Sequence, residues 1–261
     1  PTGIERMDAD GTNRQTLVSQ ATSAAPQGIA LDLINDKLYW TDWVTNKIQR
    51  SDLDGTNIED LITEGLNLPE GMALDMDNEK MYWVDSGNKK IQRANLDGTV
   101  IQDLVNYPAV NLDAIALDKE QGKMYWTLWG AGSAKGKVMR ANLDGTNIEE
   151  LISISNGILK GLDLDVENGK MYWTDCSYSK IQRANLDGSE QEDLVTGLSS
   201  PNSLSLDLIQ QKIYWTDLGS RKIQRSNLDG TQVYTIANAG VDSPQGLVVY
   251  LNDYINSVAA L

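Results

Sequence analysis

The sequence predicts an all-β repeat protein, because three features recur along the whole chain. The dipeptide Tyr-Trp returns at intervals of about 43 residues, beginning at Tyr39, Tyr82, Tyr125, Tyr172 and Tyr214. The dipeptide Asp-Gly returns at similar intervals, beginning at Asp10, Asp54, Asp97, Asp144, Asp187 and Asp229. Each interval contains four short runs of strand type and no stretch with a helical period. Six units of four antiparallel strands are typical of a six-bladed β-propeller, which we expect to form one domain over residues 1–261.

One unit, residues 69–105, shows the expected elements in order, PEGMALDMDNEKMYWVDSGNKKIQRANLDGTVIQDLV. The apolar run at 72–74 predicts the first strand, and the turn-forming segment MDNE follows it. The run at 80–85 contains the aromatic pair, and the run at 90–95 alternates between apolar and polar residues. The segment LDGT then predicts a turn into a fourth strand at 100–105. We therefore expect four strands joined by short turns in every unit.

The two ends of the chain are expected to share the sixth blade. Residues 4–18 match the third and fourth strands of a unit, and residues 246–259 match a first strand and a degenerate second strand. Joining these segments would remove the open ends of the ring, where unpaired sheet edges could pair with other chains. We therefore expect two strands from each end in this blade, and a lower melting temperature when residues 1–19 are deleted.

The residues of the repeated motif are expected to be structural. Successive side chains of a strand point to opposite faces, so the Tyr and the Trp would face the two neighbouring blades. An Arg follows the Asp at the end of the second strand at constant spacing. We predict half-buried ion pairs between the second and third strands, formed by Asp42 and Arg50, Asp85 and Arg93, Asp175 and Arg183, and Asp217 and Arg225. The repeated Asp-Gly predicts a turn rather than a calcium loop, because the ligand spacing of such a loop is absent.

Recurring motifs of the chain resemble those of a known family. YWTD occurs at 39–42, 172–175 and 214–217, together with segments of the type KIQRANLDG and GIALD. These segments resemble the YWTD, or class B, repeats of the low-density lipoprotein receptor family, and they extend over the whole chain. The resemblance implies a non-catalytic, extracellular or cell-surface module whose loop face binds a protein or an extended peptide. It does not specify the ligand.

The candidate binding residues form two groups on the predicted loop face. The loops between second and third strands vary after the motif and contain Trp43, Asn46, Asn88, Trp129, Tyr178 and Arg221. The second group precedes each innermost strand, at the expected mouth of the central channel, and consists of Gln27, Glu70, Asp113, Lys160, Asn202 and Gln245. Tryptophan is a preferred binding anchor, but packing over a neighbouring blade would also explain the two tryptophans, and solvation alone would explain the polar ring. The resemblance implies that Asn202 grips a ligand side chain and that Trp43 and Trp129 line a groove.

The composition excludes several classes of function. The chain has no His, which removes histidine bases and His metal sites, and its single cysteine, Cys176, cannot form an intramolecular disulfide. The net charge of −15 argues against a nucleic-acid partner. It indicates either a solvated acidic surface or a basic partner. No apolar run is long enough to span a membrane. Because the chain begins at Pro1, we expect a monomeric domain of a larger protein.

Two other functions stay open. Glu70 and Asp113 fall in adjacent blades, where paired carboxylates would suit acid-base catalysis or a small calcium site; no other cofactor is expected. The domain could also be a structural spacer in an adhesin-like surface protein. Exposed side chains of Trp43 and Trp129 would favour binding, and burial of both would favour the spacer.

The third repeat deviates from the others in the segment KMYWTLWGAGSAKGKVMR, residues 123–140. Leu128 replaces the Asp that ends the second strand, and the loop that follows is longer. Arg140 keeps its place but loses the expected carboxylate partner. We expect the enlarged loop, with Trp129, to overhang the binding face beside Asp113.

Overall fold

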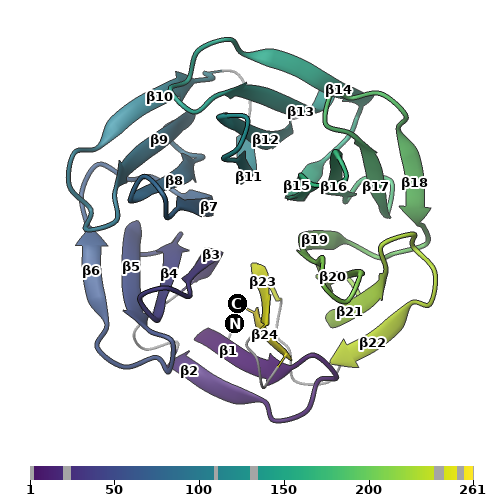
Figure 1. Cartoon of the computed structure of the whole chain (residues 1–261), viewed down its shortest axis with the longest axis horizontal. Coiled ribbons are helices and arrows are strands. Elements are labelled where there is room, and N and C mark those ends of the chain that lie inside the picture. Colours follow the sequence, from purple (N-terminus) through teal and green to yellow (C-terminus); the bar gives the residue numbers. More distant parts are fainter. Residues whose placement is uncertain are drawn as a thin grey trace.

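The structure is a computed structural model that describes residues 3–19, 25–108, 111–129, 135–237, 244–251 and 256–260, with the side chains of residues 251 and 256–260 not described. The described residues form 24 β-strands in six four-stranded antiparallel sheets. Figure 1 shows these sheets standing around a central axis. The predicted all-β propeller architecture with four-stranded blades is confirmed. Within the described part of the chain, no helix has the length and apolar character needed to cross a membrane.

Five of the sheets are blades built from four consecutive strands each. Blade 1 contains β3 (Pro26–Asp32), β4 (Lys37–Asp42), β5 (Lys47–Asp52) and β6 (Glu59–Ile62), and blade 2 contains β7 (Pro69–Asp75), β8 (Lys80–Asp85), β9 (Lys90–Asn95) and β10 (Gln102–Asn106). Blade 3 contains β11 (Asn111–Asp118), β12 (Lys123–Trp129), β13 (Lys135–Asn142) and β14 (Glu149–Ser155). Blade 4 contains β15 (Leu159–Asp165), β16 (Lys170–Asp175), β17 (Lys180–Asn185) and β18 (Glu192–Val195). Blade 5 contains β19 (Pro201–Asp207), β20 (Lys212–Asp217), β21 (Lys222–Asn227) and β22 (Tyr234–Ala237).

The expected count of six is corrected to five continuous blades, which stand beside one further sheet that joins two strands from each end of the chain. The remaining sheet, here called the closing sheet, has the strand order β2-β1-β24-β23. It combines β1 (Gly3–Asp8) and β2 (Gln15–Ser19) with β23 (Leu247–Leu251) and β24 (Asn256–Ala260), and β1 pairs directly with β24. The ring thus consists of five continuous blades and one composite sheet that lacks the Tyr-Trp motif (Figure 1).

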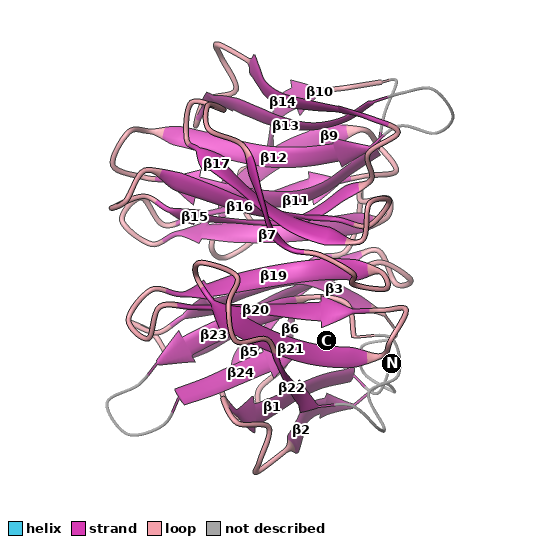
Figure 2. Ribbon diagram, turned by 90° about the vertical axis from the view of Figure 1, so that its right-hand side faces the viewer, coloured by secondary structure: helices cyan, strands magenta, loops and turns pink. Residues whose placement is uncertain are grey.

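The hydrophobic core lies between neighbouring sheets rather than inside any one of them. Tyr39 packs with Met72 and Met81 of blade 2, whereas the adjacent Trp40 packs with Ile4 of the closing sheet. All five Tyr-Trp pairs are at most 1% exposed, which confirms their packing role. Six such clusters, one at each junction, hold the ring together. Figure 2 shows the disc from its side, with strands of successive blades layered on one another.

The predicted ion pairs between the Asp that ends each second strand and the Arg of the third strand are wrong. The antiparallel register of blade 1 places Asp42 opposite Lys47, whereas Arg50 lies opposite Tyr39 at the other end of the hairpin. Arg50 forms an ion pair with Glu59 of β6 and donates a hydrogen bond to the Tyr39 hydroxyl. The constant spacing thus reflects the hairpin length and not a contact between the two residues.

The same arginines connect each blade to the next one. In all five continuous blades the guanidinium donates a hydrogen bond to a backbone carbonyl of the following sheet, from Arg50 to Leu96, Arg93 to Leu143, Arg140 to Leu186, Arg183 to Leu228 and Arg225 to Ala9. The last of these bonds joins blade 5 to the closing sheet. The arginine therefore stabilises the arrangement of the blades rather than the hairpin in which it lies.

Candidate functional site

The innermost strands of the sheets surround a central cavity of about 870 Å³. All six residues of the predicted polar ring line it, namely Gln27, Glu70, Asp113, Lys160, Asn202 and Gln245. Trp43 and Trp129 line the same cavity. The structure therefore brings together eight of the twelve predicted site residues at one mouth of the channel, where the loops from second to third strands meet the starts of the innermost strands.

The Thr of the YWTD motif positions the residues of this mouth. The buried Thr41 hydroxyl accepts a hydrogen bond from the Gly28 amide (2.8 Å) and donates one to the carbonyl of Glu70 (2.7 Å) in the next blade. The equivalent bonds in other blades run from Thr127 to Lys160, from Thr174 to Asn202 and from Thr216 to Gln245. A buried hydroxyl of this kind satisfies two backbone groups at once. The second strand of one blade thus fixes the backbone of the mouth residue that follows it.

Lys160 is held by two neighbours at the mouth. Its Nζ lies 2.5 Å from the Asp113 carboxylate and 5.3 Å from the centre of the Trp129 ring. Burial alone would lower the pKa of Lys160, but the carboxylates of Asp113 and Glu70 reverse this effect and raise the pKa. Lys160 is therefore a permanent cation, clamped between an acid and an aromatic face.

Glu70 lies on the same wall without a partner of its own. Among the described residues, none forms a hydrogen bond or an ion pair with its carboxylate. Burial raises the pKa of Glu70 to about 8, and the nearby charge of Asp113 adds to this rise while Lys160 opposes it. The cavity mouth therefore contains one carboxyl group that has no direct partner and holds its proton more strongly than an ordinary Glu.

Trp43 and Leu68 form an exposed apolar edge beside Glu70. The Trp43 side chain is 39% exposed and that of Leu68 is 37% exposed. Leu68 adopts a left-handed conformation (φ 55°), which L-residues with a β-carbon avoid. The side-chain oxygen of Asn46 accepts a hydrogen bond from the Leu68 amide (2.7 Å) and supports this conformation. Asn46 thus acts on the mouth indirectly, by holding Leu68.

The other predicted loop residues lie away from the cavity. Asn88 donates hydrogen bonds to the Gly65 carbonyl and to the Asp85 carboxylate, so its side chain joins two loops. The Tyr178 ring is 50% exposed, and its hydroxyl donates to the carbonyl of Ser155. Arg221 is exposed at the turn between β20 and β21. These residues shape the surface around the site. Residues 130–134 of the enlarged third-repeat loop lie outside the described residues.

On one side of the polar ring, two neighbouring side chains bond to each other. The Asn202 side chain donates to the backbone carbonyl and to the side-chain oxygen of Gln245, at 3.2 and 3.1 Å. Both amides are thereby partly satisfied within the protein. The part of the ring around Gln27 and Glu70 has no such bond among the described residues, which leaves it as the side available to a ligand.

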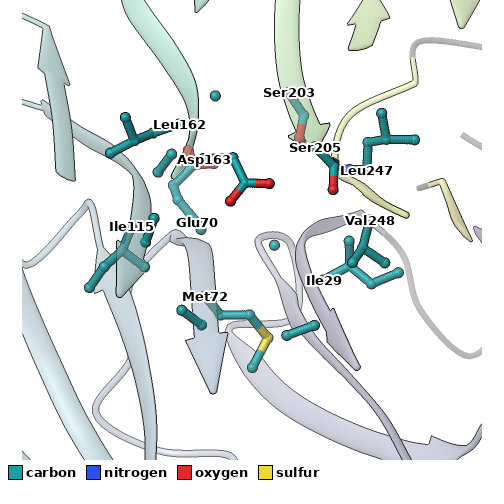
Figure 3. A pocket seen from close by; sticks show the side chains of 18 of the residues that line it. Ile29, Glu70, Met72, Ile115, Leu162, Asp163, Ser203, Ser205, Leu247 and Val248 are labelled. Atoms are coloured by element: carbon teal, nitrogen blue, oxygen red, sulfur yellow. Dashed lines mark hydrogen bonds between the residues drawn. The ribbon is translucent and has the colours of Figure 1, made fainter. Parts of the chain in front are cut away.

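The sequence did not identify the polar groups deeper in the channel. Asp163 accepts hydrogen bonds from the amides of Leu164 and Leu206, and the hydroxyls of Ser203 and Ser205 accept bonds from the amides of β23. Burial raises the pKa of Asp163 to about 6. Figure 3 shows Asp163 and Glu70 among apolar side chains of the cavity wall. The available signal was the segments GLDLD (161–165) and SLSLD (203–207), which have Asp or Ser before the Leu where blades 1 to 3 have Ala.

These polar groups satisfy the inner edges of the sheets. Innermost strands have one unpaired edge, and its N–H groups need acceptors when they are buried. Asp163, Ser203 and Ser205 supply those acceptors in one half of the channel. Over the described ranges, no group of three or more acidic, Cys or His side chains is arranged to hold a metal ion.

Two family models match parts of the chain. The model described as low-density lipoprotein receptor repeat class B matches residues 36–76, 169–208 and 211–251. The model described as SMP-30/gluconolactonase/LRE-like region matches residues 57–153. The first model covers the YWTD segments of blades 1, 4 and 5, and the second covers the mouth residues Glu70 and Asp113.

Solved propellers resemble the whole fold. A chain from the crystal structure of the nidogen/laminin complex is 24% identical, with a TM-score of 0.86 over 95% of this chain and 99% of that chain. A regucalcin from Agrobacterium tumefaciens, described as a calcium-binding protein, is 12% identical, with a TM-score of 0.73 over 92% and 90% of the two chains. A gluconolactonase from Xanthomonas campestris is 15% identical, with a TM-score of 0.70 over 90% and 85%. At these identities the likeness shows a shared fold.

Proposed function

Because this chain is a β-propeller with class B repeats of the low-density lipoprotein receptor, we propose that it is a non-catalytic module that binds a protein or an extended peptide at the channel mouth. The observation that carries this proposal is the exposed apolar edge of Trp43 and Leu68 beside the half-buried Glu70. An exposed aromatic ring beside an uncompensated polar group has the character of an interface anchor. Since the nidogen propeller is found in a complex with laminin, a protein partner agrees with the fold comparison. An extracellular location belongs to the same proposal.

The exposure of Trp43 supports binding more than a spacer role. Trp43 is 39% exposed at the mouth. Trp129 is only partly exposed, and its ring is occupied by Lys160. Of the two predicted anchors, Trp43 is therefore the one that a partner would contact first.

The proposal is tested by selecting peptides from a display library on the intact domain. Selected peptides should lose binding at least tenfold when Trp43 is changed to Ala, because the largest apolar contact of the mouth is removed. The control is Ile209→Ala, which changes an 80% exposed apolar residue at the opposite end of the blades. Selection of no peptide, or of peptides that respond to Ile209→Ala and not to Trp43→Ala, would reject binding at the mouth.

An enzyme is the second candidate, and one observation favours it. The gluconolactonase-like match includes Glu70 and Asp113, which lie at the mouth with a raised pKa on Glu70. Against this role, Asp113 is already bound by Lys160. Lactone hydrolysis should be measured with and without added calcium. Turnover that disappears in Glu70→Gln would favour the enzyme, and binding of peptides without turnover would favour the module.

A further inference from the structure

The internal repeat places two tryptophans in equivalent positions at the mouth. Trp43 and Trp129 each come directly after the residue that ends the YWTD or YWTL segment, Asp42 in blade 1 and Leu128 in blade 3. In both blades the motif Thr donates a hydrogen bond to the carbonyl of the mouth residue that comes next, which is Glu70 beside Trp43 and Lys160 beside Trp129. Glu70 and Lys160 therefore occupy equivalent positions in the repeat, Glu70 next to Trp43 and Lys160 next to Trp129.

The second of these positions shows how the mouth binds an ammonium group. Lys160 Nζ sits over the Trp129 ring and forms an ion pair with Asp113. An aromatic face and a carboxylate together are a known combination for recognising a cation. Between blades 1 and 2, Glu70 takes the place that Lys160 has at the other junction, so an acid lies beside the ring and no described residue places a cation there.

We propose that Trp43, Leu68 and Glu70 form a subsite for a lysine side chain of the bound partner, with the aliphatic stem on Trp43 and Leu68 and the ammonium at Glu70. This inference rests on the proposed binding function and specifies its ligand chemistry. Lysine fits because its four-carbon stem covers apolar surface while its charge reaches a polar group. The partner's ammonium takes the role at this junction that Lys160 has at the other.

The charges of the mouth agree with this assignment. Asp113 and Lys160 compensate each other, so Glu70 would add an uncompensated negative charge when it ionises, and an ammonium group bound beside it would favour that ionisation. The whole chain has a net charge of −15, which also attracts a basic partner. The left-handed Leu68 adds a geometric reason, because strained residues are often kept where a side chain must be presented to a ligand.

The test uses a small probe, Nα-acetyl-lysine N-methylamide, added to the ¹⁵N-labelled domain and followed by NMR. The indole signal of Trp43, identified as the one missing in Trp43→Phe, should shift together with the amide of Gly71. The same concentrations of the norleucine analogue, which has the stem without the charge, should give at most a fraction of this shift. Equal shifts with both probes, or no shift with lysine up to tens of millimolar, would overturn the proposal.

Three variants test which charged group at the mouth recognises the ammonium group. Glu70→Gln should abolish the lysine-dependent shift, whereas Glu64→Gln, which removes an exposed carboxylate from the same loop, should retain it. Lys160→Gln should create a second site, seen as a new lysine-dependent shift of the Trp129 indole. An unchanged response in Glu70→Gln, or no response at Trp129 in Lys160→Gln, would count against recognition by the acid and the ring.

The outcome is separable from that of the proposed function. If selected peptides bind at Trp43 but tolerate replacement of every Lys by norleucine without loss of affinity, the binding module stands and the lysine subsite fails. If the lysine probe binds but no peptide is selected, the subsite stands and binding of an extended peptide fails.

Discussion

At the scale of single residues, the channel mouth combines polar side chains that bond to each other with the carboxyl group of Glu70, which does not. Lys160 and Asp113 form an ion pair, and Asn202 bonds to Gln245. Glu70 has its backbone fixed by Thr41 but no direct partner for its carboxyl group among the described residues. A buried polar group without a partner costs stability. Glu70 is therefore the residue at which pH and ligands should have the largest effect.

The stability of the domain should fall as the pH rises from about 4.5 to about 8. Over this range Glu70 is ionised in the unfolded chain but still protonated in the folded domain. The pKa of Glu70 is raised from 4.5 to about 8 in the fold, so the folded state binds the proton more tightly than the unfolded state between these values. The unfolding free energy contributed by this group is complete below pH 4.5 and is lost as pH rises to about 8. Urea denaturation at a series of pH values measures this effect.

The comparison that isolates Glu70 is made above pH 6. Asp163, with a pKa raised to about 6, causes a similar decline only at lower pH. Glu70→Gln should flatten the decline between pH 6 and about 8, because the amide does not ionise, and Glu64→Gln should not. Parallel curves for the wild type and Glu70→Gln would show that Glu70 keeps an ordinary pKa.

At the scale of strands, sequence reasoning found the elements and missed some of their connections. The aromatic pair and the turn residues recur strongly enough to predict four strands per repeat, and period-two alternation gave the correct faces for Tyr39 and Trp40. The contact of Arg50 was predicted wrongly, because spacing along one hairpin carries no information about the neighbouring blade whose carbonyl it reaches. The bond from Thr41 to Glu70 was missed for the same reason.

Asp-Gly turns show the same limit at the outer strands. The sequence predicts a turn, and the Asp side chain does accept hydrogen bonds from the residue two positions later, as Asp54 does from Thr56. The glycine has a second function. A β-carbon at Gly55 would lie 2.1 Å from the Leu17 carbonyl of the closing sheet. The glycine is thus required by the contact between sheets as well as by its positive φ.

The bonds formed by the Thr of the YWTD motif can be tested in both directions, by removing the hydroxyl from Thr41 and by adding one at the same position of blade 2. Thr41→Val should reduce the unfolding free energy by about 1–3 kcal/mol, because the Gly28 amide and the Glu70 carbonyl both lose a buried partner. Val84 occupies the same position in blade 2 and is fully buried, so the shape of Val is tolerated there. Val84→Thr should be neutral or should stabilise by about 1 kcal/mol.

Urea unfolding monitored by circular dichroism measures both changes. A Thr41→Val variant as stable as the wild type would mean that the hydroxyl contributes no net stability, and the account of how Glu70 is positioned would have to be abandoned. Thr45→Val, in the exposed turn after the strand, is the control for a Thr-to-Val change outside the core.

At the scale of the whole molecule, the closing sheet decides whether the ring behaves as one cooperative unit. Arg225 of blade 5 donates to Ala9, and Met7 of β1 packs in one cluster with Tyr214. On the other side, Ile4 and Trp40 share a cluster. The N-terminal strands therefore contact both neighbouring blades. The sequence predicted which segments meet here, because each segment matches one half of a repeat, but it contains no direct sign of the strength of these contacts.

Two glycines with the same backbone conformation test this cooperativity. Gly11 in the closing sheet and Gly188 in blade 4 both have φ +86°, and a β-carbon would lie 2.2 Å from the Ile236 carbonyl or 2.5 Å from the Leu151 carbonyl. Changing either to Ala adds similar strain and a similar clash with the preceding blade. Each change should lower the melting temperature by about 4 °C or more, because 1 kcal/mol corresponds to about 2–4 °C in a domain of this size.

Calorimetry distinguishes a closed cooperative ring from one that opens at its composite sheet. If the closing sheet is part of the cooperative unit, Gly11→Ala and Gly188→Ala should both unfold in a single shifted transition, and deletion of residues 1–19 should lower the transition further. Gly122→Ala is the control for strain alone, since φ is +62° and no atom lies within 4 Å of the added carbon. An early separate transition in Gly11→Ala, absent from Gly188→Ala, would show that the ring opens locally. The channel mouth would then lose the support of Gln245 for Asn202 before the rest of the domain unfolds.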